Sequence, residues 1–423
     1  TTSGLINLAK RIETLETSSA SGANGADGAN GTNGADGTNG TNGADGANGT
    51  NGTNGNDAAA GRQYGYDIAY TATVVTGTVG PWGDEMATAI GVDGNPIIAY
   101  DHLASNDGMG VTHCDDVVCT TSTTTDYKLG SDTGNGISLT IGTDGNPIIS
   151  HADRDAGHLV VTHCDNVACT TATHTTYTTT NGDGSGTSIT IGTDGNPIIS
   201  HYDVADWHLV VTHCGNVACT TATHTAYTTG NENGWDTAIT IGTDGNPIIS
   251  HTDIRAGGLV VTHCGNVACT TATHTTYTTD NGGRYSSITI GTDGNPIISH
   301  NDSDAGDLVV THCDNVACTT ATHTTYTTPG NEDGRYSSIT IGTDGNPIIS
   351  HYDHDARDLV VTHCDNVACT TATHTTHTTT NGDGLDTSIT IGTDGNPIIS
   401  HRSGSDLVVT HLSKSAWTNN GWD

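Results

Sequence analysis

The chain has 423 residues, of which 46 are Asp or Glu and only 11 are Lys or Arg, so its formal net charge is −35. Such a charge repels nucleic acid and anionic membrane surfaces, so we expect neither as a partner. No apolar stretch is long enough to cross a bilayer, which argues against membrane insertion. The chain has no Phe and only 4% aromatic residues, so its fold must rely on Val and Ile strands, backbone ladders and cross-links.

Residues 1–21 predict a short coiled coil. Leu5, Leu8, Ile12 and Leu15 are spaced by 3, 4 and 3 residues, as at the a and d positions of a heptad repeat. Two heptads are short for a coiled coil, and an ordinary amphipathic helix is the alternative.

Residues 22–57 predict a collagen-like stalk. Glycine occupies every third position through twelve triplets, and only glycine fits the axis of a collagen triple helix. The tract contains no Pro, so the preceding coil would have to hold three chains in register. We therefore expect a homotrimer through coil and stalk, with a flexible Gly-rich linker as the alternative. The segment resembles the collagen-like tracts of bacterial surface proteins and phage tail fibres, which implies an extended spacer.

The stalk also holds four Asn-Gly-Thr sequons on side chains that must point outward in a triple helix. The candidate glycosylation sites are Asn30, Asn39, Asn48 and Asn51. In a repeat so rich in Asn and Thr, chance is the alternative explanation.

After a linker at 58–66, the tetrapeptide Asp-Gly-Asn-Pro occurs seven times at intervals of 49 to 51 residues. Each unit contains four Val-, Ile- or Thr-rich runs, and the Asp-Gly turn between the first two is a strong hairpin signal. Seven units of four antiparallel strands predict an all-β fold, a seven-bladed β-propeller over residues 67–423.

The last unit lacks its Thr-rich outer run. A run of matching character lies before the first unit, at residues 68–77. We expect this strand to complete the seventh blade and to close the ring.

Twelve cysteines form six identical Cys-x4-Cys pairs, a spacing that suits a disulfide across a hairpin and indicates an oxidising compartment. The expected pairs are Cys114 and Cys119, Cys164 and Cys169, Cys214 and Cys219, Cys264 and Cys269, Cys313 and Cys318, and Cys364 and Cys369. Zinc is the alternative, because five units carry a His five residues after the second Cys. The first unit has Thr124 at that place, so we expect structural histidines and no metal or other cofactor.

These units resemble the roughly 50-residue repeats of secreted bacterial proteins that are similar to sialidase-like propellers, over about residues 80–412. The sialidase Asp-box, Ser-x-Asp-x-Gly-x-x-Trp, is absent from the sequence. The resemblance thus implies the fold and gives no support to the enzymatic branch.

Comparison between the copies separates two sets of connections. The Asp-Gly-Asn-Pro turns and the Cys hairpins hardly change, whereas the loops that follow Ser-His-x-Asp and those that lead into each first strand change in almost every copy. These variable loops would share one face of the ring, where propellers commonly bind ligands. Its Arg and aromatic residues suit sugar rings, carboxylates and sulfates, and the alternative is that surface loops vary freely and that each Arg pairs with an adjacent Asp. The candidate ligand-binding residues are Arg154, Trp207, Trp235, Arg255, Arg284, Tyr285, Arg335, Tyr336, Arg357 and Arg402.

The paired His and Asp residues recur in nearly identical form, unlike an active site, which is normally built once. We therefore expect no catalytic residues and no enzyme activity. The favoured function is an extracellular or cell-surface structural or adhesive fibre subunit, a glycoprotein whose stalk carries propeller heads or polymerises into filaments. The alternative is a carbohydrate-binding head of a phage or cell-surface fibre, and a glycan-processing enzyme ranks third. The chain opens at Thr1 without a leader, which we interpret as a mature, exported protein.

Overall fold

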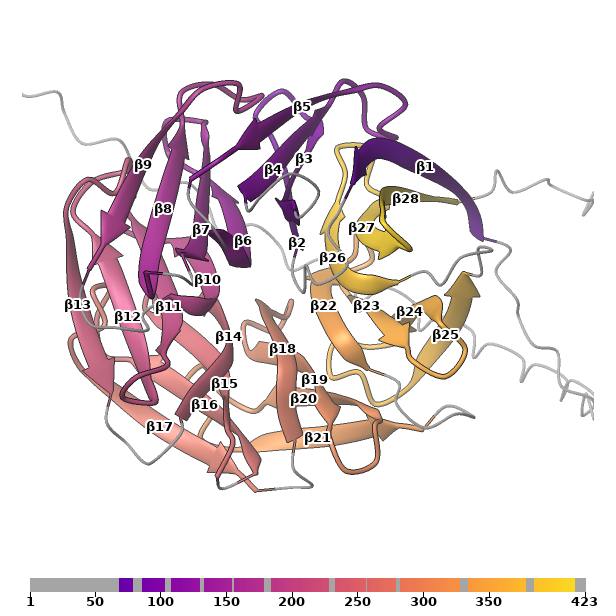
Figure 1. Ribbon diagram of the computed structural model, residues 1–423. Coiled ribbons are helices and arrows are strands. Elements are labelled where there is room, and N and C mark those ends of the chain that lie inside the picture. The colour runs from indigo at the N-terminus through magenta and orange to yellow at the C-terminus, as the bar shows by residue number, and fades with distance from the viewer. Residues whose placement is uncertain are drawn as a thin grey trace, which may run out of the picture. The chain divides into compact units, whose positions relative to one another are not determined.

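The computed structural model describes residues 68–78, 86–102, 108–129, 133–153, 156–178, 184–227, 233–255, 257–278, 282–327, 334–377 and 384–414. In these ranges the chain forms 28 β-strands and no helix. The strands make seven antiparallel four-stranded sheets arranged around a central axis (Figure 1), so the predicted all-β seven-bladed propeller is confirmed. The predicted coiled coil, collagen-like stalk and linker, over residues 1–66, lie outside the described residues.

Six blades use four consecutive strands each, with the first strand innermost and the fourth outermost (Figure 1). Blades 1 to 3 consist of β2 (Met86–Ile90), β3 (Pro96–His102), β4 (Gly108–Cys114) and β5 (Ser122–Tyr127); β6 (Thr133–Ile141), β7 (Pro147–Asp153), β8 (His158–Cys164) and β9 (Ala172–Tyr177); and β10 (Ser185–Ile191), β11 (Pro197–Asp203), β12 (His208–Cys214) and β13 (Ala222–Tyr227). Blades 4 to 6 consist of β14 (Asn233–Ile241), β15 (Pro247–Asp253), β16 (Gly258–Cys264) and β17 (Ala272–Tyr277); β18 (Gly282–Ile290), β19 (Pro296–Asp302), β20 (Leu308–Cys313) and β21 (Ala321–Tyr326); and β22 (Arg335–Ile341), β23 (Pro347–Asp353), β24 (Asp358–Cys364) and β25 (Ala372–His377).

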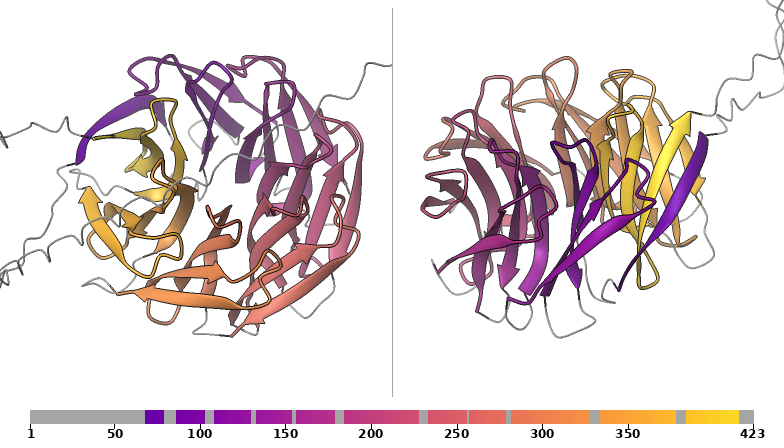
Figure 2. Two further views of the ribbon diagram at one scale, coloured as in Figure 1. Left: turned by 180° about the vertical axis from the view of Figure 1, so that it is seen from behind. Right: turned by 90° about the horizontal axis from the view of Figure 1, so that it is seen from above.

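Blade 7 joins the two ends of the described chain. It contains β26 (Leu385–Ile391), β27 (Pro397–Ser403), β28 (Asp406–Lys414) and, as its outer strand, β1 (Ile68–Thr78). β1 runs antiparallel to β28 from the pair Ile68 and Lys414 to the pair Thr78 and Asp406. The indigo β1 lies beside the yellow β28 in the views of Figure 2. The strand predicted at residues 68–77 therefore closes the ring.

The repeated turn shows why each blade begins with a hairpin. In blade 3, Gly195 has a φ of 83°, a left-handed conformation that glycine adopts at little cost. The carboxylate of Asp194 accepts a hydrogen bond of 3.1 Å from the backbone N–H of Asn196. Pro197 then opens β11, where its missing N–H does least harm.

The core lies between neighbouring blades. Between blades 3 and 4, for example, Ile198, Leu209 and Val211 pack against Ile249 and the disulfide of blade 4. All six predicted disulfides are present, each joining cysteines five positions apart. Their sulfurs are buried, so the disulfides are part of the apolar core that a chain without Phe would otherwise lack.

The histidines belong to repeated hydrogen-bond networks. In blade 3, the buried His201 contacts the Thr212 hydroxyl at 2.9 Å, and the same hydroxyl lies 2.8 Å from Nδ1 of His224. Every blade also pairs a second histidine with the Asp of its Asp-Gly turn, at 2.7 to 2.8 Å. The described residues contain no group of three or more His, Cys, Asp or Glu arranged to hold a metal ion. The structure thus gives these histidines structural partners.

These His–Asp contacts define two faces of the ring. They bring the Asp-Gly turns to the ends of the third strands, next to the Cys hairpins, as in the pair His213 and Asp194. We call this side the turn face. The opposite side, where the first strands begin and the second strands end, is the loop face. No described segment forms a helix of the length and hydropathy needed to cross a membrane.

Candidate functional site

A β-bulge begins the innermost strand of each of blades 2 to 7 on the loop face. The register with the second strand shifts there, as between Trp235 and Ala238 in blade 4. The bulge residue has a positive φ in all six blades. It is glycine in blades 2 and 3, but Asp236, Tyr285, Tyr336 and Asp386 in blades 4 to 7, with φ between 50° and 57°.

A non-glycine residue in this left-handed conformation costs about 1 kcal/mol or more, and bulges often direct a side chain toward a functional site. Because glycine serves the same position at Gly136 and Gly186, the fold itself does not require Asp or Tyr there. These four side chains are therefore candidates for a functional role.

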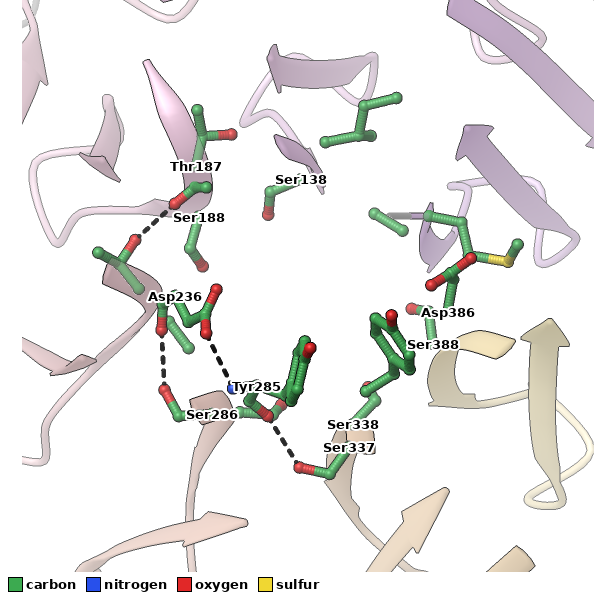
Figure 3. Close-up of a pocket in the computed structure, with 18 of the residues that line it drawn as sticks. Ser138, Thr187, Ser188, Asp236, Tyr285, Ser286, Ser337, Ser338, Asp386 and Ser388 are labelled. Carbon is green, nitrogen blue, oxygen red and sulfur yellow. Dashed lines mark hydrogen bonds between the residues drawn. The ribbon is translucent and has the colours of Figure 1, made fainter. Parts of the chain in front are cut away.

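The four bulge side chains line a cavity of about 380 Å³ on the axis of the ring, which we call the axial cavity. Figure 3 shows Asp236 and Asp386 on opposite sides of this cavity, with Tyr285 between them along one wall. Trp235 and Arg284 also line it. The cavity thus combines carboxylates, aromatic rings and a guanidinium group contributed by different blades.

A ring of serines lines the axial cavity below the bulge residues. Each of these hydroxyls accepts a hydrogen bond of 3.0 to 3.2 Å from a backbone N–H of the next blade. The serines are Ser138, Ser188, Ser287, Ser338 and Ser388, and alanine takes the place at Ala87 and Ala238. These hydroxyls hold adjacent innermost strands together and give the cavity a fixed polar lining.

The surroundings of Asp236 shift the pKa of its carboxyl group. Burial raises the pKa of Asp236 to about 6, although the backbone N–H of Tyr285 and the charge of Arg284 oppose the rise. Its Oδ2 accepts a hydrogen bond of 3.2 Å from that N–H (Figure 3). A carboxyl group with a pKa near 6 holds or releases a proton close to neutral pH, as general acids and bases do.

The second carboxyl group, that of Asp386, is fully buried and its Oδ2 lies 3.4 Å from Nε of Arg402. Arg402 is itself only 8% exposed. Arg402 was predicted in the exposed ligand-binding loops, and this predicted location is wrong. Arg402 lies on β27, opposite Leu385 on β26, where its charge balances a buried carboxylate.

The aromatic side chains of the loop face form two pairs. The rings of Tyr285 and Tyr336 lie 4.6 Å apart between centroids, and Trp235 meets Tyr202 edge to face at 5.5 Å. Trp235 remains 40% exposed, so its ring is available to a ligand. Burial raises the pKa of Tyr285, which keeps its hydroxyl protonated at neutral pH.

A second cavity, of about 340 Å³, lies on the loop face between blades 6 and 7; we call it the rim cavity. Its described lining comprises Arg335, Tyr336, Tyr352, His354, Arg357, Leu385 and Gly404. Tyr336 lines both cavities, so the two adjoin at this residue.

The structure therefore groups most of the residues predicted from the sequence. Trp235, Arg284, Tyr285 and Tyr336 line the axial cavity, and Arg335, Tyr336 and Arg357 line the rim cavity. Two others, Trp207 and Arg255, are exposed but line neither cavity. Arg154 and the candidate glycosylation sites lie outside the described residues.

Sequence reasoning missed Asp236 and Asp386 as site residues. A signal was present, since both occupy the same place in the repeat as Tyr285 and Tyr336, one position after Trp235 or its equivalent. The Asp residues of Ser-His-x-Asp have a different role. In blade 3, for example, Asp203 accepts hydrogen bonds from the backbone of Ala205 and Asp206, so it caps its own turn.

No protein-family model matches the sequence, and no curated protein matches it. Solved structures share the fold at about one-tenth identity. A protein from Lactobacillus plantarum is 10% identical with a TM-score of 0.51, over 75% of this chain and 99% of that one. An α-L-arabinanase from Penicillium chrysogenum, in complex with arabinobiose, is 11% identical with a TM-score of 0.48, over 81% and 98%. The NanB sialidase from Streptococcus pneumoniae is 10% identical with a TM-score of 0.47, over 80% and 70%.

These comparisons correct the expectation that the protein is not an enzyme. Enzymes are among the solved structures that the comparison finds similar: an α-L-arabinanase, a sialidase, a polysaccharide lyase and an α-L-arabinofuranosidase. The expectation was based on the repeated His and Asp pairs, which are structural in every blade. It overlooked the axial cavity, where unlike residues from different blades meet.

Proposed function

We propose that the propeller binds a carbohydrate in the axial cavity. The observation that carries this proposal is the set of bulge residues Asp236, Tyr285, Tyr336 and Asp386, which stand in left-handed backbone positions around one cavity. Aromatic rings offer flat apolar surfaces to the C–H faces of sugars, whereas carboxylates and hydroxyls accept and donate hydrogen bonds to their hydroxyl groups. A polar, partly aromatic cavity of about 380 Å³ suits one or two sugar units.

Binding to a panel of neutral and acidic oligosaccharides would test the proposal. We expect Trp235→Ala and Tyr285→Ala in the full-length protein to weaken binding about tenfold each, because each removes a ring from the cavity wall. The matched variant Trp207→Ala removes an exposed ring that lines neither cavity, and should bind as the wild type does. Equal losses in all three variants, or no binding by the wild type to any member, would contradict the proposal.

A second candidate, glycan processing, is favoured by the raised pKa of Asp236. In this function Asp236 would donate a proton to, or accept one from, an oxygen of the bound sugar. The turnover rate of a bound oligosaccharide should then fall by two or more orders of magnitude in Asp236→Asn, while its binding affinity is retained. Loss of binding together with turnover would leave Asp236 a binding residue alone.

The setting in which the propeller acts follows from its cross-links and from the sequence before it. Six disulfides are consistent with an extracellular protein. We extend the proposal to a trimer in which residues 22–57 form a stalk that carries three propellers, as the glycine period supports. Sedimentation of the full-length protein as a monomer would rule out this arrangement without affecting the axial cavity.

A further inference from the structure

The rim cavity is unusual for so acidic a chain. Among its described lining residues, two are arginines, one is a histidine and none is Asp or Glu, whereas the whole chain carries 46 acidic residues against 11 basic ones. A guanidinium group binds carboxylates and sulfates through two parallel N–H donors. The composition of the rim cavity thus indicates an anionic group.

The backbone at Arg357 supports the same conclusion. Arg357 has a φ of 61° and Trp207, at the same place in blade 3, has a φ of 58°, whereas blades 2, 4 and 5 have glycine there, at Gly157, Gly257 and Gly306. The loop is fixed around it, since the N–H of Arg357 donates to the carbonyl of Asp353 at 2.8 Å. Glycine would fill this position at less cost, so the fold does not require arginine there; unlike Trp207, Arg357 lines a cavity.

Among the described residues, the carboxylates of the neighbouring loop do not line the rim cavity. The side chain of Asp353 caps its own loop by accepting hydrogen bonds from the N–H groups of Asp355 and Ala356. Asp355 lies on the exposed side of the loop, 3.8 Å from Nδ1 of His354. Three guanidinium charges act on the hydroxyl of Tyr352: burial and the charge of Asp353 raise its pKa, and the charges of Arg357, Arg402 and Arg335 oppose that rise.

We infer that the rim cavity binds the carboxylate or sulfate group of an acidic glycan between Arg335 and Arg357, while the adjoining sugar lies over Tyr336 toward the axial cavity. This inference rests on the proposed carbohydrate binding and specifies its ligand class. Because Tyr336 lines both cavities, one oligosaccharide could extend from the rim cavity into the axial cavity. The axial cavity alone would accept neutral sugars, and the rim cavity would add selectivity for an acidic unit.

A glycan array read with the full-length protein can test this inference. Its members are uronate oligosaccharides with their methyl esters, and sulfated oligosaccharides with their desulfated forms, so each pair differs only in charge. We expect the wild type to bind an acidic member at least tenfold more tightly than its neutral match. The uronate and sulfate pairs distinguish the two sources of the anionic group.

Variants locate the selectivity. Arg335→Gln and Arg357→Gln should each weaken binding of the acidic oligosaccharide about tenfold and leave binding of its neutral match unchanged. The lysine variants Arg335→Lys and Arg357→Lys should retain part of the preference for the acidic oligosaccharide. Lys128→Gln removes an exposed charge that lines neither cavity and controls for net charge. Thermal unfolding shows whether each variant is folded. If a glutamine variant does not fold, the lysine variant at the same position can be measured in its place.

Equal binding of acidic and neutral matches by the wild type would overturn the inference and leave the proposed carbohydrate binding intact. Equal loss of both in the glutamine variants would also overturn it. If the wild type binds no member at all, both the inference and the proposed function fail.

Discussion

The two faces of this propeller are made from the same repeat, yet they differ in how the copies vary. On the turn face, every blade repeats the same Asp-Gly turn and the same His–Asp contact at 2.7 to 2.8 Å. On the loop face, the bulge residue changes from glycine in blades 2 and 3 to Asp or Tyr in blades 4 to 7. Groups that a fold requires recur with its period, whereas a binding site breaks the period. Substitutions on the turn face and in the blade interior should therefore change stability alone, and substitutions on the loop face should change ligand binding.

The largest effect should come from acidification, through the histidines in the blade interior. Burial lowers the pKa of His151 to about 4 and that of His201, His251, His300 and His351 to about 3, so these rings stay neutral when folded. Once unfolded they bind protons below about pH 6.5. Stability is thus present above that pH and is lost as the pH falls toward 4, by about 7 kcal/mol per pH unit for the five. Unfolding by denaturant at pH 7, 6 and 5 measures this slope, and a constant midpoint would contradict it.

Removal of the closing strand should have the next largest effect. A chain that begins at residue 79 lacks β1, so β28 loses its outer partner strand. The loss of Val75 also exposes core residues that pack in the same cluster, including Leu407. We expect its melting temperature to fall by about 10 °C or more, as a loss of several kcal/mol implies. The matched control begins at residue 65, the start of the compact unit that contains the propeller, and should melt as the propeller of the full chain does.

On the loop face, Asp236→Asn should raise stability while it impairs function. Because burial raises the pKa of Asp236 from 3.8 to about 6, the ionised carboxylate destabilises the folded state at pH 7 by about 2 to 3 kcal/mol. This penalty appears as the pH rises from about 4 to 6, so the Asp236→Asn variant should be no more stable than the wild type at pH 4. Asp386→Asn should instead destabilise the protein, since it leaves buried Arg402 without that carboxylate. A loss of stability in Asp236→Asn at pH 7 would show that the ionised carboxylate does not destabilise the folded state.

The smallest effect should follow from opening one hairpin of the turn face. The double variant Cys214→Ser and Cys219→Ser releases a short loop, and the chain-entropy relation predicts a cost of about 2 kcal/mol. Glycan binding should be unchanged, because these residues line neither cavity. Weaker binding in the folded double variant would break the distinction between the two faces.

Features that depend on local pattern and period could be predicted before the structure was known. The Asp-Gly-Asn-Pro turns, the strand at 68–77 and the cysteine pairs could be located because each is specified by neighbouring residues or by repetition. The same reasoning located the variable loops on one face and named Trp235, Arg284, Tyr285 and Tyr336.

Which of these residues lie next to one another depends on how the blades pack around the ring. The ring brings Asp236 and Asp386, 150 positions apart in the sequence, to one cavity, and it buries Arg402 beside Asp386 while Trp207 remains outside. The burial that raises the pKa of Asp236 likewise comes from side chains of other blades. A repeat sequence specifies each blade almost completely, but the centre of the ring is built from one position of every blade, and those positions become neighbours only when the ring closes.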